Sequence, residues 1–178
     1  MDLHLKAGRL RLLLFDVDGV LTDGTILLHA DGTEAKRFAI RDGTAIVWAQ
    51  KAGLLTGVLS ARSSAATVQR ATQLGMSIIY QGVGSKIEAF EEIVRRHAIE
   101  PPDIAYMGDD LLDLPVLQRV GLSAAPADAV PDVRARVDWV SASPGGGGAA
   151  RDLIEMVLRA QGRWDPLLHG YAVEGREP

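Results

Sequence analysis

Short apolar runs alternate with stretches of helical periodicity along most of the chain. The runs at residues 10–15, 54–59, 77–80, 104–107 and, more weakly, 139–140 carry apolar side chains at neighbouring positions, which is typical of strands covered on both faces. This alternation predicts an α/β fold, a doubly wound (Rossmann-like) parallel sheet. In such sheets, ligands bind beyond the carboxyl ends of the strands.

The helices between these runs have recognisable boundaries. A helical run at residues 65–71 stops at Gly75, and residues 149–160 repeat apolar side chains along one face. Ser85 is followed three residues later by Glu88, which is the pattern of a capping box. A further helix is therefore predicted to begin at that point.

One segment departs from the alternation. Residues 25–28 and 35–38 have β-like sequences and flank a turn signal that contains an Asp-Gly pair. This pattern predicts a β-hairpin at about residues 25–38, inserted between the first strand and its helix. Because no linker marks a second domain, we expect one domain over residues 1–178, with a C-terminal tail at about residues 162–178.

Composition narrows the classes of function. The chain has 178 residues, 47% of them apolar, and a net charge of -4, and no basic block stands out that would favour nucleic acid as a partner. The apolar runs are far shorter than the roughly 20 residues of a membrane span, and the first residues lack the pattern of a secretory signal. The absence of cysteine excludes disulfides and thiolate metal sites. We therefore expect a cytoplasmic protein.

The first apolar run ends in two acidic residues, Asp16 and Asp18, followed by Gly19. Carboxylates are costly to bury beside a core unless a cation, a proton or hydrogen bonds compensate. Two acids at a strand end could divide catalytic work, one as nucleophile or metal ligand and the other as acid/base. The alternative is that both only fix a turn before Gly19 through Asx hydrogen bonds.

Polar residues also follow the next two predicted strands. Ser60 and Arg62 come after residues 54–59, and Lys86 opens a helix after residues 77–80. A lysine in the first turn of a helix opposes the helix dipole, so a neighbouring anion would account for it. The alternatives are a serine that merely starts a turn and a solvated surface lysine.

Three acidic residues follow the strand predicted at residues 104–107. Asp109, Asp110 and Asp113 stand close together in the sequence, and clustered carboxylates favour a hard divalent cation such as Mg²⁺. For Asp113 the alternative is a helix cap, because Pro115 lies in an early turn of the next helix. Since all of these features follow predicted strands, we expect them to meet at one edge of the sheet.

Taken in order, these motifs resemble those of a known superfamily. "DVDGVLTDG", "LSAR", Lys86 and "GDDLLD" resemble the four motifs of the haloacid dehalogenase superfamily, and the second acid, Asp18, indicates its phosphatase branch. Only residues 19–59 separate Asp18 from Ser60. This leaves no room for a cap domain of the usual kinds, so the hairpin must stand in for one.

A narrower resemblance covers residues 10–162, nearly the whole chain. "FAIRDGTAI", "LGMSIIYQGVGSK", "AYMGDDLLDLPVL", "VGLSAAPADA" and "GGGGAARDLIEMVL" are similar to segments of the capless phosphatases that act on 3-deoxy-D-manno-octulosonate 8-phosphate in lipopolysaccharide sugar synthesis. Two positions depart from that family. Ser60 stands where threonine is common, and Ala39 stands where asparagine is usual.

The resemblance implies catalytic roles for four residues. Asp16 would be the nucleophile that forms an aspartyl-phosphate, which water then hydrolyses. Asp18 would protonate the leaving sugar oxygen and later activate that water. Ser60 and Lys86 would offset the negative charge that a carboxylate and a phosphate bring together.

The resemblance also implies a magnesium cofactor. Mg²⁺ would be held by Asp16, by the backbone carbonyl of Asp18 and by Asp109. Asp110 and Asp113 would lie close by, and whether either of them contacts the metal stays open.

A small sugar acid phosphate is the implied partner. Because it carries charge at both ends, cationic side chains are expected around it. The resemblance further implies a homotetramer whose hairpins form a central barrel. Beyond Asp18 and Lys86, the implied substrate-binding residues are Ala39, Ile40, Arg41, Asp42, Gly43, Val47, Arg62 and Arg70.

Three other functions compete with this interpretation. The nearest is a phosphatase for another nonulosonate, such as a sialic acid-type 9-phosphate, because it would also pair a carboxylate with a terminal phosphate. A second is a catalytically silent oligomerisation or regulatory module, which the presence of Asp16, Asp18, Lys86 and Asp109 disfavours. A third is a small-phosphate hydrolase with little specificity.

Overall fold

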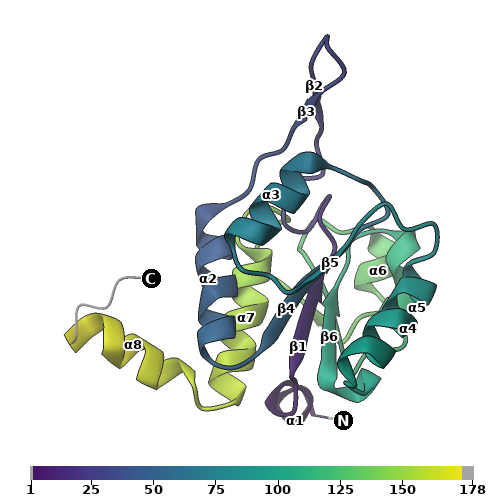
Figure 1. Cartoon of the computed structure of the whole chain (residues 1–178). Coiled ribbons are helices and arrows are strands. Elements are labelled where there is room, and N and C mark those ends of the chain that lie inside the picture. Colours follow the sequence, from purple (N-terminus) through teal and green to yellow (C-terminus); the bar gives the residue numbers. More distant parts are fainter. Residues whose placement is uncertain (1, 174–178) are drawn as a thin grey trace.

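A six-stranded parallel sheet forms the centre of the protein (Figure 1). The computed structural model describes residues 2–173. The strands run in the order β5-β4-β1-β6-β7-β8, so β1, which Asp16 directly follows, is central. Their bounds are β1 (Leu12–Phe15), β4 (Leu55–Leu59), β5 (Ile78–Tyr80), β6 (Ile104–Met107), β7 (Leu122–Ala125) and β8 (Trp139–Val140).

Helices cover both faces of this sheet. Figure 1 shows α2 and α7 on one side and α4, α5 and α6 on the other. The helices are α1 (Leu3–Gly8), α2 (Ile40–Lys51), α3 (Ala65–Gln73), α4 (Lys86–His97), α5 (Leu114–Leu117), α6 (Pro131–Arg134), α7 (Ala149–Ala160) and α8 (Trp164–Val173). Two short 3₁₀ turns, η1 (Pro101–Asp103) and η2 (Leu111–Asp113), precede β6 and α5.

Strand β1 shows why the sequence forms this layered structure. Successive side chains of a strand point to opposite faces. Leu13 and Phe15 accordingly pack in the core beneath α2 and α7, while Leu12 and Leu14 pack in the core beneath α4 and α5. All four are fully buried, so the run of consecutive apolar residues reflects a strand that is covered on both sides.

The sequence-based prediction of a doubly wound α/β sheet is confirmed. The helix of the capping-box pattern spans Lys86–His97, and the Ser85 hydroxyl accepts a hydrogen bond from the Glu88 amide. Strand β7 was not predicted, because its Leu-Ser-Ala-Ala sequence carries little of the β-branched signal. It is nevertheless completely buried between β6 and β8, which shows that tertiary packing outweighs its weak local preference.

The predicted hairpin is present and projects from the carboxyl edge of the sheet (Figure 1). Its paired strands, β2 (Leu27–Leu28) and β3 (Glu34–Ala35), are shorter than the sequence suggested. The turn between them is closed by a hydrogen bond from the His29 amide to the Thr33 carbonyl. Leu27 and Leu28 are 62% and 70% exposed, so this short hairpin offers apolar side chains that nothing in the described chain covers.

The last described helix, α8, docks on α2 through aromatic side chains. The rings of Trp48 on α2 and Trp164 on α8 meet edge to face, with centroids 5.7 Å apart. The Trp48 indole N–H donates to the Tyr171 hydroxyl at 2.8 Å. The predicted tail after residue 162 thus forms a packed helix, and residues 174–178 of that tail lie outside the described range.

None of the helices found between residues 2 and 173 combines the length and the apolar character that crossing a membrane would require.

Two isoleucines on helices provide a matched test of this packing. Ile93 on α4 is fully buried, whereas Ile40 at the start of α2 is 81% exposed. Replacing Ile93 with Ala should lower the free energy of unfolding by about 2–5 kcal/mol, because it removes buried methylenes and leaves a cavity. Replacing Ile40 with Ala should change it by less than about 0.5 kcal/mol. Urea unfolding measures both, and equal losses would contradict this account of the core.

Candidate active site

The motif residues meet at the carboxyl edge of the sheet, as their positions after predicted strands indicated. They line a cleft of about 250 Å³. Its polar side chains come from the ends of β1, β4 and β6 and from the first turn of α4. The predicted residues among them are Asp16, Asp18, Ser60, Arg62, Lys86, Asp109, Asp110 and Asp113.

Asp16 is held rigidly at the end of β1. Its amide donates to the Met107 carbonyl at 2.9 Å, which continues the pairing of β1 with β6 by one residue. Its Oδ1 accepts from the Val17 amide at 2.6 Å and its Oδ2 accepts from Lys86 Nζ at 2.7 Å. The side chain is therefore fixed in place by the backbone that follows β1 and by a lysine of α4, seventy residues later in the chain.

A tight loop brings the acidic groups of β1 and β6 together. Gly19 has φ of +85°, and a Cβ at this position would lie 2.0 Å from Asp109 Oδ2. Glycine is therefore needed here both for the left-handed backbone and for the close approach. The glycine run at residues 145–148 supports this loop from the other side, because Gly146 N–H donates to the Val20 carbonyl at 2.9 Å. These glycines are packed, so they do not act as a flexible linker.

Lys86 is the buried cation of the cleft. It is 7% exposed, and its Nζ lies 2.7 Å from Asp16 Oδ2 and 2.6 Å from Asp113 Oδ1. Burial alone would lower the pKa of Lys86, but the charges of Asp16 and Asp113 outweigh it and raise the pKa above its usual value. The anion expected beside a first-turn lysine is therefore present, and the surface-lysine interpretation is wrong.

Asp113 organises its neighbours and does not cap α5. Its Oδ2 accepts from the amides of Asp109 and Asp110 at 2.9 and 3.1 Å, and its Oδ1 accepts from Lys86 and from the Tyr106 hydroxyl. No side-chain hydrogen bond caps the start of α5. The alternative interpretation of Asp113 as a cap of α5 is thus wrong; its bond to the Asp110 amide instead completes a capping box on η2, the 3₁₀ turn that precedes α5.

Tyr106 belongs to this cluster and was missed in the sequence. It lies inside β6, fully buried, and its hydroxyl donates to Asp113. Burial, followed by the charge of Asp113, raises the pKa of Tyr106 well above its usual range, so the phenol keeps its proton. The only signal was a tyrosine in an otherwise apolar strand, since a buried tyrosine hydroxyl usually finds a partner.

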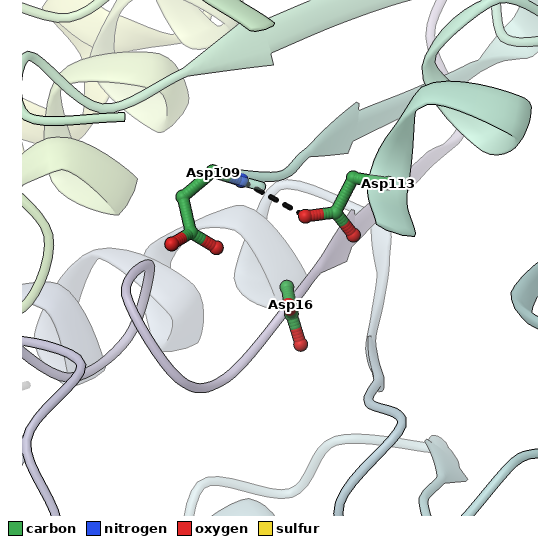
Figure 2. Close-up of side chains that lie close together, drawn as sticks. All are labelled: Asp16, Asp109 and Asp113. Carbon is green, nitrogen blue, oxygen red and sulfur yellow. Dashed lines mark hydrogen bonds between the residues drawn. The ribbon is translucent and has the colours of Figure 1, made fainter. Parts of the chain in front are cut away.

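The carboxylates of Asp16, Asp109 and Asp113 form a cluster that could hold a metal ion. Figure 2 shows them converging from the end of β1, the loop after β6 and the turn η2, and one oxygen of each lies within 4.8 Å of the others. Burial and then the charge of Asp113 raise the pKa of Asp16 to about 6, and burial, Asp113 and Asp16 raise that of Asp109 to about 7. A hard divalent cation would relieve this repulsion.

The donor set fits magnesium through two of these carboxylates. Both oxygens of Asp113 already accept hydrogen bonds from Lys86, Tyr106 and two amides. Asp16 retains lone pairs on both oxygens, and the hydrogen bonds of Asp109 among residues 2–173 are made by its backbone, which leaves its carboxylate open to a metal. Asp16 and Asp109 are therefore the better ligands, and Asp113 fixes their surroundings.

Asp18 sits at the mouth of the cleft and is bound by cations from other elements. Its Oδ1 pairs with Lys36, which follows β3 of the hairpin, and its Oδ2 lies 3.6 Å from Arg62 Nε. Arg62 also donates to Glu34 Oε2 at 3.1 Å. Neither Lys36 nor Glu34 was identified from the sequence, where they stood in a hairpin strand with no chemical motif around them.

The other predicted substrate residues lie apart from this cleft in the single chain. Ala39, Asp42, Gly43 and Arg70 line a separate cavity of about 10 Å³ between α2 and α3. Burial raises the pKa of Asp42. Of the remaining three, Ile40 and Arg41 are exposed and Val47 is half-buried. Only Arg62 of this set reaches the cleft, and the substrate contacts of the others stay predictions.

Comparison with known proteins confirms the family resemblance that the motifs indicated. Residues 58–153 match the model of the haloacid dehalogenase-like hydrolase family. The chain is 42% identical to the 3-deoxy-D-manno-octulosonate 8-phosphate phosphatase KdsC of Escherichia coli, over 92% of this chain and 87% of that protein.

Two solved structures share the fold closely. The 3-deoxy-D-manno-octulosonate 8-phosphate phosphatase of Yersinia pestis superposes with a TM-score of 0.89 and 36% identity, over 91% of this chain and 88% of the other. The corresponding phosphatase of Moraxella catarrhalis, solved with a magnesium ion, a phosphate ion and a KDO molecule, superposes with a TM-score of 0.90 and 34% identity, over 93% and 95%.

The carboxylate cluster predicts that a divalent cation stabilises the fold in a pH-dependent way. Because the folded-state pKa values of Asp16 and Asp109 lie above the usual 3.8, the metal-free fold should lose stability as pH rises from about 4 towards 7. Above that range both acids are ionised and bind Mg²⁺ most strongly. The rise in melting temperature on adding Mg²⁺ should therefore be larger at about pH 8 than at about pH 5.

An Asp109→Asn variant provides the control for this measurement, because it removes one charge and one ligand with little change in volume. Its melting temperature should respond weakly to Mg²⁺ at either pH. An unchanged response in this variant would mean that the ion binds elsewhere.

Proposed function

The chain belongs to the haloacid dehalogenase-like hydrolases, in the branch of the 3-deoxy-D-manno-octulosonate 8-phosphate phosphatases, and we propose that it releases inorganic phosphate from that sugar acid phosphate in lipopolysaccharide sugar synthesis. The observation that carries this proposal is the pairing of Asp16 with Lys86 beside Asp109 at the strand ends. It occurs in a chain 42% identical to a phosphatase of this specificity. The enzyme is thus a phosphoric monoester hydrolase.

In the first step, Asp16 acts as the nucleophile. One of its carboxylate oxygens attacks phosphorus, a bond forms to give an aspartyl-phosphate, and the bond from phosphorus to the sugar oxygen breaks. The electron pair stays on that oxygen, which takes a proton from Asp18. In the second step, Asp18 takes a proton from water as the water oxygen attacks phosphorus. The bond from phosphorus to the Asp16 oxygen breaks, its electron pair stays on Asp16 as a carboxylate, and inorganic phosphate leaves.

The surrounding cations make this attack feasible. A carboxylate and a phosphate repel each other, and the buried Lys86 ammonium beside Asp16 offsets that charge, together with the Ser60 hydroxyl. When bound by Asp16, Asp109 and the backbone carbonyl of Asp18, Mg²⁺ would supply further charge stabilisation for the phosphoryl oxygens. Asp113 and Tyr106 hold Lys86 in position for this task.

The sugar acid end of the substrate needs cationic partners as well. Arg62 lies on the cleft with its side chain about half exposed, so it can turn towards a substrate carboxylate. Arg41 and Arg70 lie away from the cleft of their own chain. We propose that they contact substrate only in the assembled enzyme, where subunits lie side by side.

We further propose that residues 1–178 act as one capless domain in a cytoplasmic homotetramer. The exposed Leu27 and Leu28 support an assembly through the hairpins, because short isolated hairpins are marginal in water and apolar strand edges tend to pair. Pairing of hairpins above the strand ends would also restrict access of water to each cleft. A cytoplasmic location agrees with a chain that contains no cysteine.

The chemistry is tested with a substrate panel. With Mg²⁺, the protein should release phosphate from 3-deoxy-D-manno-octulosonate 8-phosphate with a kcat/KM well above that for sialic acid-type 9-phosphates and for simple sugar phosphates. Asp16→Asn should lower turnover at least about 10⁴-fold without changing the melting curve, because the nucleophile is lost with little change in volume. A preference for a 9-phosphate, or an active Asp16→Asn variant, would overturn this assignment.

The assembly is tested by mass in solution. Light scattering should give the mass of a tetramer for the wild type, and the double variant Ile26→Asp, Leu28→Asp should dissociate and lose activity, because it places charges in the proposed apolar contact. Leu5→Asp is the matched control, since Leu5 is also exposed but lies on α1, far from the hairpin (Figure 1). A fully active wild-type monomer would contradict the proposal.

A further inference from the structure

Lys36 is an unusual residue for its position in the chain. It follows β3 in a hairpin that is mostly exposed, yet only 1% of its side chain is accessible. Its ammonium group pairs with Asp18 Oδ1 and lies 3.9 Å from Glu34 Oε1. A buried ammonium is costly unless it is paired, so this lysine depends on Asp18 for its place in the fold.

The two oxygens of Asp18 have different surroundings. Oδ1 is held by Lys36, whereas Oδ2 is buried and has no hydrogen-bond partner among residues 2–173. Arg62 Nε lies 3.6 Å from Oδ2, which is beyond a hydrogen bond. Asp18 lines the cleft, so the pairing of Oδ1 with Lys36 fixes the rotamer of a cleft side chain and leaves Oδ2 with Arg62 as its neighbour and no hydrogen bond.

A second ion pair joins the hairpin to the same region. Arg62, which follows β4, donates to Glu34 Oε2 on β3 at 3.1 Å. The hairpin is thus tied to the cleft at Glu34 and at Lys36, through two different loops of the sheet edge. These ties connect the position of the hairpin to the orientation of Asp18.

We propose that Lys36 is a positioning residue for the reaction. It holds Asp18 through Oδ1 so that Oδ2, which makes no hydrogen bond, is directed at the leaving oxygen, and the inference therefore rests on the proposed function. When Asp16 attacks phosphorus and the bond to the leaving oxygen breaks, the electron pair on that oxygen takes the proton from Asp18. Without Lys36, Asp18 can rotate away, and the alkoxide must leave without that proton.

Leaving groups of different basicity separate this role from a general loss of structure. A sugar alkoxide needs the proton, whereas p-nitrophenolate leaves readily without it. Lys36→Gln should therefore lower kcat about 100-fold for the sugar acid phosphate, a loss of the size that misplacing a catalytic group causes, but only a few-fold for p-nitrophenyl phosphate. KM should change little for either substrate, and Lys36→Arg should recover part of the lost kcat.

Arg37→Gln is the control variant, because Arg37 is the next residue of the hairpin, has a side chain 88% exposed, and pairs with Asp23 outside the cleft. Its kinetics should match the wild type. Melting curves establish that each variant is folded, and if Lys36→Gln unfolds, Lys36→Met is measured in the same way. Equal losses on both substrates in a folded variant, or no loss on either, would overturn the role of Lys36.

A wrong substrate assignment would give a different result from a wrong role of Lys36. If the wild type hydrolyses aryl and simple alkyl phosphates but not the sugar acid phosphate, the proposed substrate is wrong, and the ratio of alkyl to aryl rates in Lys36→Gln still decides the role of Lys36. A wild type that hydrolyses none of these esters overturns both.

Discussion

The arrangement of the site depends on compensating a cluster of negative charges at one edge of the sheet. Asp16, Asp109 and Asp113 bring their carboxylates within 4.8 Å of one another, in surroundings where burial raises the pKa of Asp16 and Asp109. Lys86 is the buried cation that makes this arrangement tolerable. A site with this balance has a ready place for a hard divalent cation and for a phosphoryl group. These carboxylates repel one another and so lower the free energy of unfolding, but the same carboxylates would bind the metal and attack the phosphoryl group.

The cluster divides its work among its members. Asp113 accepts four hydrogen bonds and thereby sets the positions of Lys86, Tyr106 and the loop that carries Asp109. Asp16 and Asp109 keep oxygens free for a metal or a substrate. The hairpin adds a further element, because Lys36 places a cation on Asp18 from outside the sheet. On the roles proposed above, this contact lets a short projecting segment orient the acid/base of the reaction.

The sequence predicted the parts of this site that depend on strand ends. Because carboxyl ends of parallel strands share an edge, the positions of Asp16, Ser60 and Asp109 directly after apolar runs were enough to place them together. The role of Asp113 could not be predicted, since its position before Pro115 suggested a helix cap equally well. Contacts between individual side chains, such as Lys36 with Asp18 or Tyr106 with Asp113, produce no repeating pattern in the sequence from which they could be predicted. Strand β7 was missed for a related reason: its alanines fit a buried space but have weak strand preference.

In the proposed reaction, Asp16 carries the phosphoryl group during turnover. The most direct measurement is to quench the enzyme with borohydride while it hydrolyses substrate, which reduces an acyl phosphate to the alcohol, and then to sequence its peptides by mass spectrometry. Homoserine is expected at position 16 in the quenched enzyme, and aspartate is expected there in enzyme without substrate. Turnover that leaves Asp16 unmodified, or that converts another carboxylate such as Asp18 or Asp109, would contradict it.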